Sequence, residues 1–186
     1  MNEPDEAAAV RRCQTGDPEA FRAVVDRYRT VLFGTAYLMT RDRDLAEDAV
    51  QQALVQIWRH LPSLRLRGSL KAWLVRIVVN EVNQQRRQKH VPAVHLDQMP
   101  DVVDETDDVE AALVSDERRR GLRRALDELP AEQKEAVVLR YFSDLTVPEV
   151  AAAMGCREGT IKSRLSRALG RLGEILRSEE VLGERR

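Results

Sequence analysis

Helical spacing of apolar residues runs through most of this 186-residue chain and is interrupted at length between residues 90 and 108. On both sides of the interruption, hydrophobic residues recur every three or four positions, the period of one face of an α-helix. The stretch VPAVHLDQMPDVVDETDD, residues 91–108, has two prolines, no sustained period and mostly acidic charge. The pattern predicts an all-α chain of two small helical domains, residues 1–90 and 109–186, joined by a flexible acidic linker.

Three amphipathic helices are predicted in the first domain. One begins after Asp17, a capping residue that precedes a proline tolerated at the first helical position. A second begins near Asp42 or Asp44 and ends before Pro62, and a third follows Ser69 and continues to about residue 89. Together these helices can enclose one small core.

The second domain contains a helix-turn-helix pattern. Thr146 and Glu149 have the spacing of a capping box at the start of a helix of about two turns. Gly155 can end that helix with a positive φ, and a longer basic helix starts near Glu158, with Ile161 on its apolar side. A short helix, a tight turn and a longer basic helix are typical of a DNA-binding helix-turn-helix.

Charge is segregated along the chain, although the formal net charge is only −1. Residues 59–89 and residues 157–177 are rich in Lys and Arg, whereas residues 97–117 contain acidic side chains and neither Lys nor Arg. Two basic modules suit a polyanion, because neutralised phosphates release their counterions. Ordinary solvated surface remains the alternative for each charged run.

Helical wheels place polar side chains with DNA-contacting chemistry on one face of each basic helix. In the first domain this face consists of Arg76, Asn80, Asn83, Gln84 and Arg87. In the second domain it includes Thr160, Ser163, Ser166 and Arg167, opposite the apolar stripe, with Lys162 and Arg164 at its flanks. Amide and hydroxyl groups can bind base edges while the cations bind phosphates.

Four ordered segments, from about Gly16 to Arg177, resemble the extracytoplasmic-function (ECF) sigma factors of bacterial RNA polymerase. They include residues 44–48, the spacing of Gln52 and Trp58, SLKAWLVRIVVNEVNQQRRQK, and the EGTIKSR of residues 158–164. The resemblance implies that the first domain binds the polymerase clamp helices and reads the minus-ten promoter element. The second domain would then read the minus-thirty-five element and hold the polymerase flap.

Site residues follow from this resemblance by position. The polymerase contacts would be Asp48, Gln51, Gln52 and Gln56. The minus-ten contacts would be Arg65, Arg67, Arg76, Asn80, Asn83, Gln84 and Arg87. The minus-thirty-five contacts would be Arg157, Thr160, Lys162, Ser163, Arg164, Arg167 and Arg171. The polymerase residues could instead be plain surface polars, and Arg171 a solvated charge.

The resemblance also implies promoter DNA, core RNA polymerase and an anti-sigma factor, often membrane-associated, as partners. The loop of residues 62–69 would capture a flipped base without an aromatic wedge, because Trp58 and Trp73 are predicted to be core residues. The linker carboxylates could mimic nucleic acid along their path through the polymerase, a hypothesis from charge alone.

Other function classes find less support in the sequence. The three histidines have no matching ligand pattern, and no phosphate-binding or nucleophile motif is present, so no enzymatic activity, metal or cofactor is predicted. Cys13 and Cys156 are expected to be reduced and structurally incidental. The acidic N-terminus and the lack of a long apolar run predict a cytoplasmic protein. A stand-alone helix-turn-helix regulator remains the alternative, whereas a protein-interaction adaptor would have no use for two basic faces.

Overall fold

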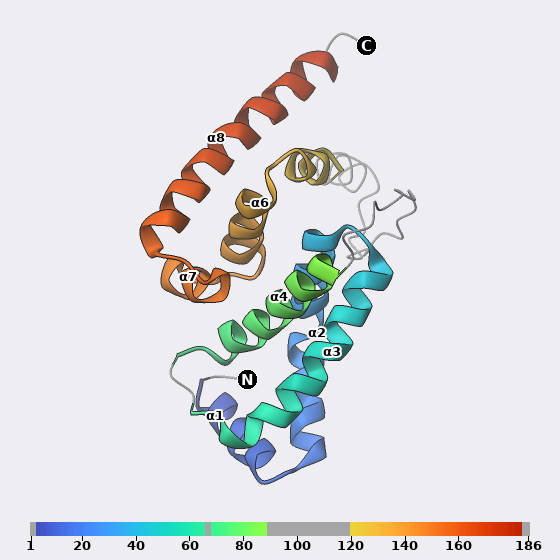
Figure 1. Cartoon of the computed structure of the whole chain (residues 1–186), viewed down its shortest axis with the longest axis vertical. Helices are drawn as coiled ribbons and strands as arrows, with labels where there is room; N and C mark the ends of the chain where they lie inside the picture. Colours follow the sequence, from blue (N-terminus) through green and yellow to red (C-terminus); the bar gives the residue numbers. More distant parts are fainter. Residues whose placement is uncertain (1–2, 66–67, 89–119, 184–186) are drawn as a thin grey trace, which may run out of the picture.

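The computed structural model describes residues 3–65, 68–88 and 120–183, and in these residues the regular structure is helical, without a strand (Figure 1). The predicted linker, its carboxylates and the start of the second domain lie outside the described residues, as does Arg67. The all-α prediction is therefore confirmed for the part of the chain that the structure describes.

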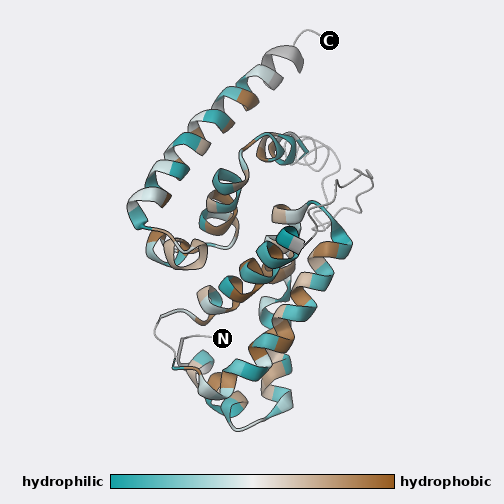
Figure 2. Ribbon diagram, in the orientation of Figure 1, coloured by the Kyte–Doolittle hydropathy of each residue, from teal (hydrophilic) through white to brown (hydrophobic). Residues whose placement is uncertain are grey.

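The first domain is a bundle in which α2, α3 and α4 pack against one another and α1 packs on α2. In Figure 2 the apolar positions of α2, α3 and α4 gather where these helices meet. The elements are α1 (Glu3–Gln14), α2 (Pro18–Thr40), α3 (Arg43–His60), a short 3-10 helix η1 (Leu61–Ser63) and α4 (Leu70–Gln88).

Local capping explains where the three predicted helices begin. The Asp17 carboxylate accepts hydrogen bonds from the backbone N–H groups of Glu19 and Ala20, at 3.0 and 3.1 Å. At the next two helices, Asp42 accepts from the N–H of Leu45 at 3.0 Å, and the Ser69 hydroxyl from that of Ala72 at 3.3 Å. Each cap satisfies an N–H group that has no partner within its helix.

Two features of this domain differ from the sequence prediction. Helix α1 was not predicted, although Val10 and Cys13 bury one side of it in the core at 5% and 1% exposure. Trp58 was predicted to be a core residue, and this was wrong because its side chain is 40% exposed and only meets Phe21 edge to face. Trp73 is partly buried and packs against the core, as predicted.

The second domain has the predicted helix-turn-helix. A helix over residues 120–127 precedes α6 (Ala131–Val137), which continues into the five-residue π-helix η2 (Val138–Phe142). The helix-turn-helix consists of α7 (Val147–Met154) and α8 (Glu158–Gly183), joined at Gly155 with a φ of 63°. Ile161 is fully buried, so it fixes α8 to the domain as the sequence indicated.

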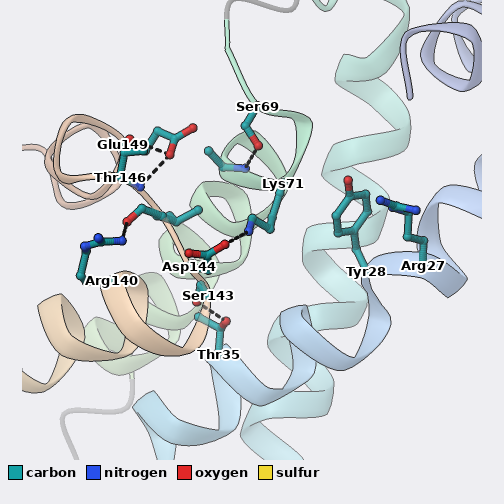
Figure 3. A network of polar contacts seen from close by, with 12 residues as sticks. Arg27, Tyr28, Thr35, Ser69, Lys71, Arg140, Ser143, Asp144, Thr146 and Glu149 are labelled. Carbon is teal, nitrogen blue, oxygen red and sulfur yellow. Dashed lines mark hydrogen bonds and ion pairs between the residues drawn. The ribbon is translucent and has the colours of Figure 1, made fainter. Parts of the chain in front are cut away.

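The two domains lie against each other (Figure 1). Helix α7 packs on α4, and η2 packs on α2. The hydroxyls of Thr35 and Ser143 are 2.9 Å apart and both residues are buried, while Lys71 pairs with Asp144 at 3.1 Å beside them (Figure 3). The sequence pattern did not predict this contact.

Candidate nucleic-acid and polymerase interfaces

An open groove runs along α4, and it is the first candidate DNA site. One wall is the predicted minus-ten face, from which Arg76, Asn80, Asn83 and Arg87 line the groove. The opposite wall is the end of α7, from Ala152 to Gly155. Arg76, Asn80 and Arg87 are exposed, so their donors can reach a polyanion in solution. Gln84 is also exposed, but it does not line this groove.

Asn83 is engaged by the other domain. Its side-chain Nδ2 donates a hydrogen bond of 3.3 Å to the Glu135 carboxylate on α6. Burial raises the pKa of the Glu135 carboxyl, although this hydrogen bond and the Arg86 and Arg164 guanidinium groups favour its charged form. Asn83, a member of the predicted minus-ten face, is therefore hydrogen-bonded to an acidic side chain of the second domain. Residues that bind nucleic acid are usually basic, so this acid has the opposite charge.

Helix α8 presents the second candidate DNA face. Arg157, Lys162, Arg167 and Arg171 are exposed at its N-terminal end and along its outer side, whereas Thr160 and Ser163 are half-buried. The Ser163 hydroxyl donates to the carbonyl of Thr160 at 2.9 Å. The exposed members are spread over successive turns of one helix, as a major groove requires.

Arg164 differs from its neighbours on α8. Its guanidinium lies 2.5 Å from the Glu132 carboxylate and 3.6 Å from the Cys156 sulfur, and its side chain is only 19% exposed. These contacts join α8 to α6 and to the turn before α8. Arg164 thus holds the helix-turn-helix together in this structure, and a phosphate would have to displace Glu132 to reach it.

The predicted polymerase face of α3 combines polar and apolar side chains. Asp48, Gln51 and Gln52 are exposed, and Gln56 is half-buried. Val55 and Trp58 lie on the same exposed side, at 44% and 40% exposure. Exposed apolar side chains beside amides are typical of a protein-binding surface. Burial of the apolar side chains supplies most of the affinity for the partner protein.

Family models match both helical domains of the chain. Residues 24–91 match the model for Sigma-70 region 2, and residues 119–172 match Sigma-70, region 4. The ECF RNA polymerase sigma factor SigM of Mycobacterium tuberculosis is 36% identical over 162 residues, which cover 87% of this chain and 79% of the relative. The chain belongs to the ECF sigma factors. The ECF sigma-E factor of Escherichia coli K12 is 32% identical over 168 residues, 86% of this chain and 87% of that protein.

Solved structures show the same fold for this sigma factor. The sigma factor RpoE of Bartonella quintana, in complex with the anti-sigma factor NepR, has a TM-score of 0.69 and 31% identity over 84% of this chain and 96% of that one. CnrH, in complex with the cytosolic domain of CnrY, has a TM-score of 0.67 and 22% identity over 92% and 96% of the two chains. The second likeness supports the fold alone.

Sequence reasoning missed two residues beside the candidate faces of this sigma factor. Val55 falls three and four positions from Gln52 and Gln51, so the helical period alone could have placed it among the polar contacts. Arg86 lines the α4 groove, yet it also donates to the backbone carbonyl of Met39. No sequence signal separates this structural arginine from the arginines that are predicted to contact DNA.

The described residues hold no cluster of three His, Cys, Asp or Glu side chains that could bind a metal ion. Cys13 is buried, which raises the pKa of its thiol, and Cys156 is half-buried. None of the helices in the described ranges is long and apolar enough to cross a membrane.

Proposed function

We propose that this sigma factor directs core RNA polymerase to promoters by reading two DNA elements with α4 and α8, while α3 holds the polymerase clamp. The observation that carries the proposal is the presence of two exposed basic faces on separate helices of one chain. A regulator that binds a single operator with one helix-turn-helix has no use for the α4 face.

Reading of the minus-ten element is assigned to α4. Asn80 is exposed in the groove, where its amide can donate to and accept from a base edge. Arg76 and Arg87 flank it by about one and two helical turns and suit the phosphates on either side. Arg65, at the start of the preceding loop, is exposed and adds a further cation.

Reading of the minus-thirty-five element is assigned to α8. Its N-terminal turns carry Arg157, Lys162 and Arg167 in exposed positions, the part of a recognition helix that reaches base edges and phosphates. Arg171 lies one turn beyond Arg167 and extends the cationic surface. Phosphate contacts of this kind set affinity and register, while hydroxyl groups such as that of Thr160 contribute to sequence choice.

The partners and location follow from membership of the family. We expect the clamp of core polymerase at α3, the flap at the second domain, and an anti-sigma factor, as in the RpoE–NepR complex. The role is binding rather than catalysis, and the cytoplasm is its place of action. A membrane-associated anti-sigma factor could hold the chain at the inner face of the membrane.

The test is transcription by purified core polymerase with and without this chain on fragmented genomic DNA of the source organism. Discrete starts that share two upstream elements are expected only with the chain present. Asn80→Ala should relax preference at one minus-ten position, and Arg167→Ala should weaken use of every promoter by at least about tenfold, the cost of one strong contact.

Arg177→Ala is the matched control for Arg167→Ala. Arg177 is exposed on the same helix but lies beyond the predicted contacts, so its loss should leave the starts unchanged. Equal losses in both variants would mean that nonspecific charge, and not a DNA-reading face, supports activity. Tight binding of duplex DNA by the chain alone, with no chain-dependent starts, would instead favour a stand-alone regulator.

A further inference from the structure

The C-terminal end of α1 reaches the start of the loop that leads to α4. Helix α1 packs on η1, the short helix that follows α3 (Figure 1). The Gln14 side chain donates a hydrogen bond from its Nε2 atom to the backbone carbonyl of Leu64, at 2.7 Å. These two residues are 50 positions apart in the sequence, and both are half-buried. The contact joins α1 to the first residues of the loop.

Local contacts fix Gln14 at the end of α1. Its neighbour Cys13 is 1% exposed, within the core. The Arg12 side chain donates from Nε to the Asp17 carboxylate at 2.8 Å, and the same carboxylate caps α2. Gly16, with a φ of 83°, turns the chain between the two helices. The backbone that carries the Gln14 side chain is therefore anchored to the core and to α2.

Leu64 is held through both of its peptide units. Its N–H donates to the carbonyl of Leu61 at 3.1 Å, and its own carbonyl accepts from Gln14. The backbone of Leu64 is extended, with a φ of −65° and a ψ of 116°. A peptide unit is planar, so a fixed Leu64 carbonyl also fixes the N–H group and the Cα atom of Arg65. The hydrogen bond from Gln14 thus helps to set the point from which the Arg65 side chain extends.

Arg65 is an exposed cation and belongs to the residues assigned to the minus-ten element. An arginine side chain loses rotamer freedom when it binds a phosphate, and a mobile backbone adds the cost of ordering the chain that carries it. A backbone that is ordered before DNA arrives avoids the second cost. The Gln14 hydrogen bond supplies this order from α1, a helix that carries none of the predicted DNA contacts.

We propose that Gln14 is a positioning residue for minus-ten recognition, which holds the Leu64 carbonyl so that Arg65 reaches a phosphate of the DNA strand. The role rests on the proposed function, since it concerns the same DNA element. The other end of the loop has an anchor of its own, because the Ser69 hydroxyl accepts from the N–H of Ala72 at the start of α4. Gln14 touches no DNA in this role, so its loss should change how Arg65 binds and not which charges are present.

The salt dependence of DNA binding tests this role. Gln14→Met keeps the length of the side chain, removes the donor and changes no charge. The DNA comes from a promoter mapped with the wild-type chain and is single-stranded over the minus-ten element. Its affinity for the holoenzyme should fall about fivefold, as expected for one lost hydrogen bond. The slope of log affinity against log salt should become shallower by up to about 0.7, the value for one phosphate contact on a single strand. A purely structural role would lower the affinity without changing this slope.

Two further variants complete the design. Ala7→Met places the same side chain at an exposed position of α1, about two turns before Gln14, and should leave affinity and slope unchanged. Arg65→Ala should make the slope shallower by about 0.7 by itself. Gln14→Met added to Arg65→Ala should then cause no further loss, because a residue that acts through Arg65 has no effect without it.

The outcomes separate this role from the proposed function. An unchanged slope in Gln14→Met, or losses that multiply in the double variant, overturns the role of Gln14 and leaves the proposed function standing. Gln14→Ala removes the same donor and replaces Gln14→Met if circular dichroism shows that the latter misfolds. If the wild-type chain gives no chain-dependent starts with core polymerase, the proposed function fails, and the role of Gln14 fails with it.

Discussion

Glu135 lies where α6 meets α4 and α8, and it faces charged groups from each of these helices. Arg86 comes from α4, Arg164 from α8, and Glu132 from the same helix as Glu135. Despite two nearby cations, burial raises the pKa of this carboxyl from its ordinary value of 4.5. The folded chain therefore binds this proton more tightly than the unfolded chain does.

Glu135 should make the free energy of unfolding depend on pH. The contribution of Glu135 to stability is fully present below pH 4.5 and is lost as pH rises through the raised pKa. Glu135→Gln keeps an acceptor for Asn83 and removes the buried charge, so its free energy of unfolding should exceed that of the wild type increasingly as pH rises. Urea titrations at about pH 5 and about pH 7.5 measure this difference.

Glu128→Gln is the control for this substitution. Glu128 is exposed at the end of the helix over residues 120–127. Its removal should change stability equally at both pH values. A pH-independent change in Glu135→Gln as well would contradict the raised pKa of the buried carboxyl.

Two glycines of the second domain should respond to alanine with opposite signs. Gly155 has a φ of 63° and Gly170 is helical, and a Cβ atom would meet nothing within 4 Å at either position. Gly155→Ala should lower the free energy of unfolding by about 1 kcal/mol, since only its backbone conformation resists a side chain. Gly170→Ala should raise it by about 0.5–1 kcal/mol. Denaturant titration of both variants checks the pair, and equal signs would contradict the assigned turn.

At the scale of helices, the helix-turn-helix could be predicted because its signals are local. Thr146 donates from its backbone N–H and from its hydroxyl to the Glu149 carboxylate, at 2.8 and 2.7 Å. Gly155 has the positive φ expected of a glycine that ends a helix, and Ile161 is buried. Each of these features depends on residues within a turn or two along the chain.

Features that depend on distant partners could not be predicted from spacing. The end of α6 widens into a π-helix over Val138–Phe142, and Phe142 then lies on Gly34 of the other domain. Helix α1 was missed because its apolar side is made of small residues and Cys13. Trp58 has the period of a core residue, yet its side chain stays 40% exposed and meets Phe21 of α2 in a T-shaped contact.

At the candidate sites, sequence reasoning predicted which side chains share a helix face but not the contacts that each of them makes. Asn80 and Arg167 are exposed as a DNA-reading residue must be, whereas Arg164 is paired with Glu132. Asn83 is bonded to Glu135 across the domain contact. Helical periodicity tells which side chains share a face, but not which acids from other helices lie opposite them.

A charged side chain introduced among the exposed apolar residues of α3 should weaken the binding of this helix to core polymerase. Val55 is 44% exposed, between Gln52 and Gln56, so Val55→Glu removes no internal packing of consequence. Affinity for core polymerase should fall by at least about tenfold, or about 1.4 kcal/mol, because a desolvated charge replaces an apolar contact. Fluorescence titration of core polymerase with labelled chain measures the change.

Thr30→Glu is the matched control for Val55→Glu. Thr30 is an exposed residue of α2 and lies outside the predicted polymerase face. It introduces the same charge into the same domain. Equal losses of affinity in the two variants would assign the effect to net charge and would contradict the docking role of α3. Thermal unfolding of both variants should match that of the wild type.

At the scale of the whole molecule, the two domains touch through a contact that contains few buried groups. Its centre consists of the Phe142 ring on Gly34 and one buried hydroxyl pair, and its ion pairs are partly exposed. A flexible connection such as the predicted linker supplies an effective concentration on the order of 1 mM. A contact that would be weak between separate molecules can therefore be mostly closed within one chain.

The affinity of the two domains for each other can be measured on separate fragments. Each has its own buried core, with Ile57 and Val78 in the first and Leu139 and Ile161 in the second, so fragments 1–88 and 109–186 should fold alone. We expect them to associate with a Kd of about 0.1 mM, which at an effective concentration of about 1 mM gives about ten closed molecules for each open one. Heteronuclear NMR titration can detect binding this weak, with shifts expected at Gly34 and Thr35. A Kd below about 1 μM would imply a closed excess of about a thousandfold and would contradict a contact built from few buried groups. No detectable binding would mean that the chain is open in solution and that α4 is always accessible.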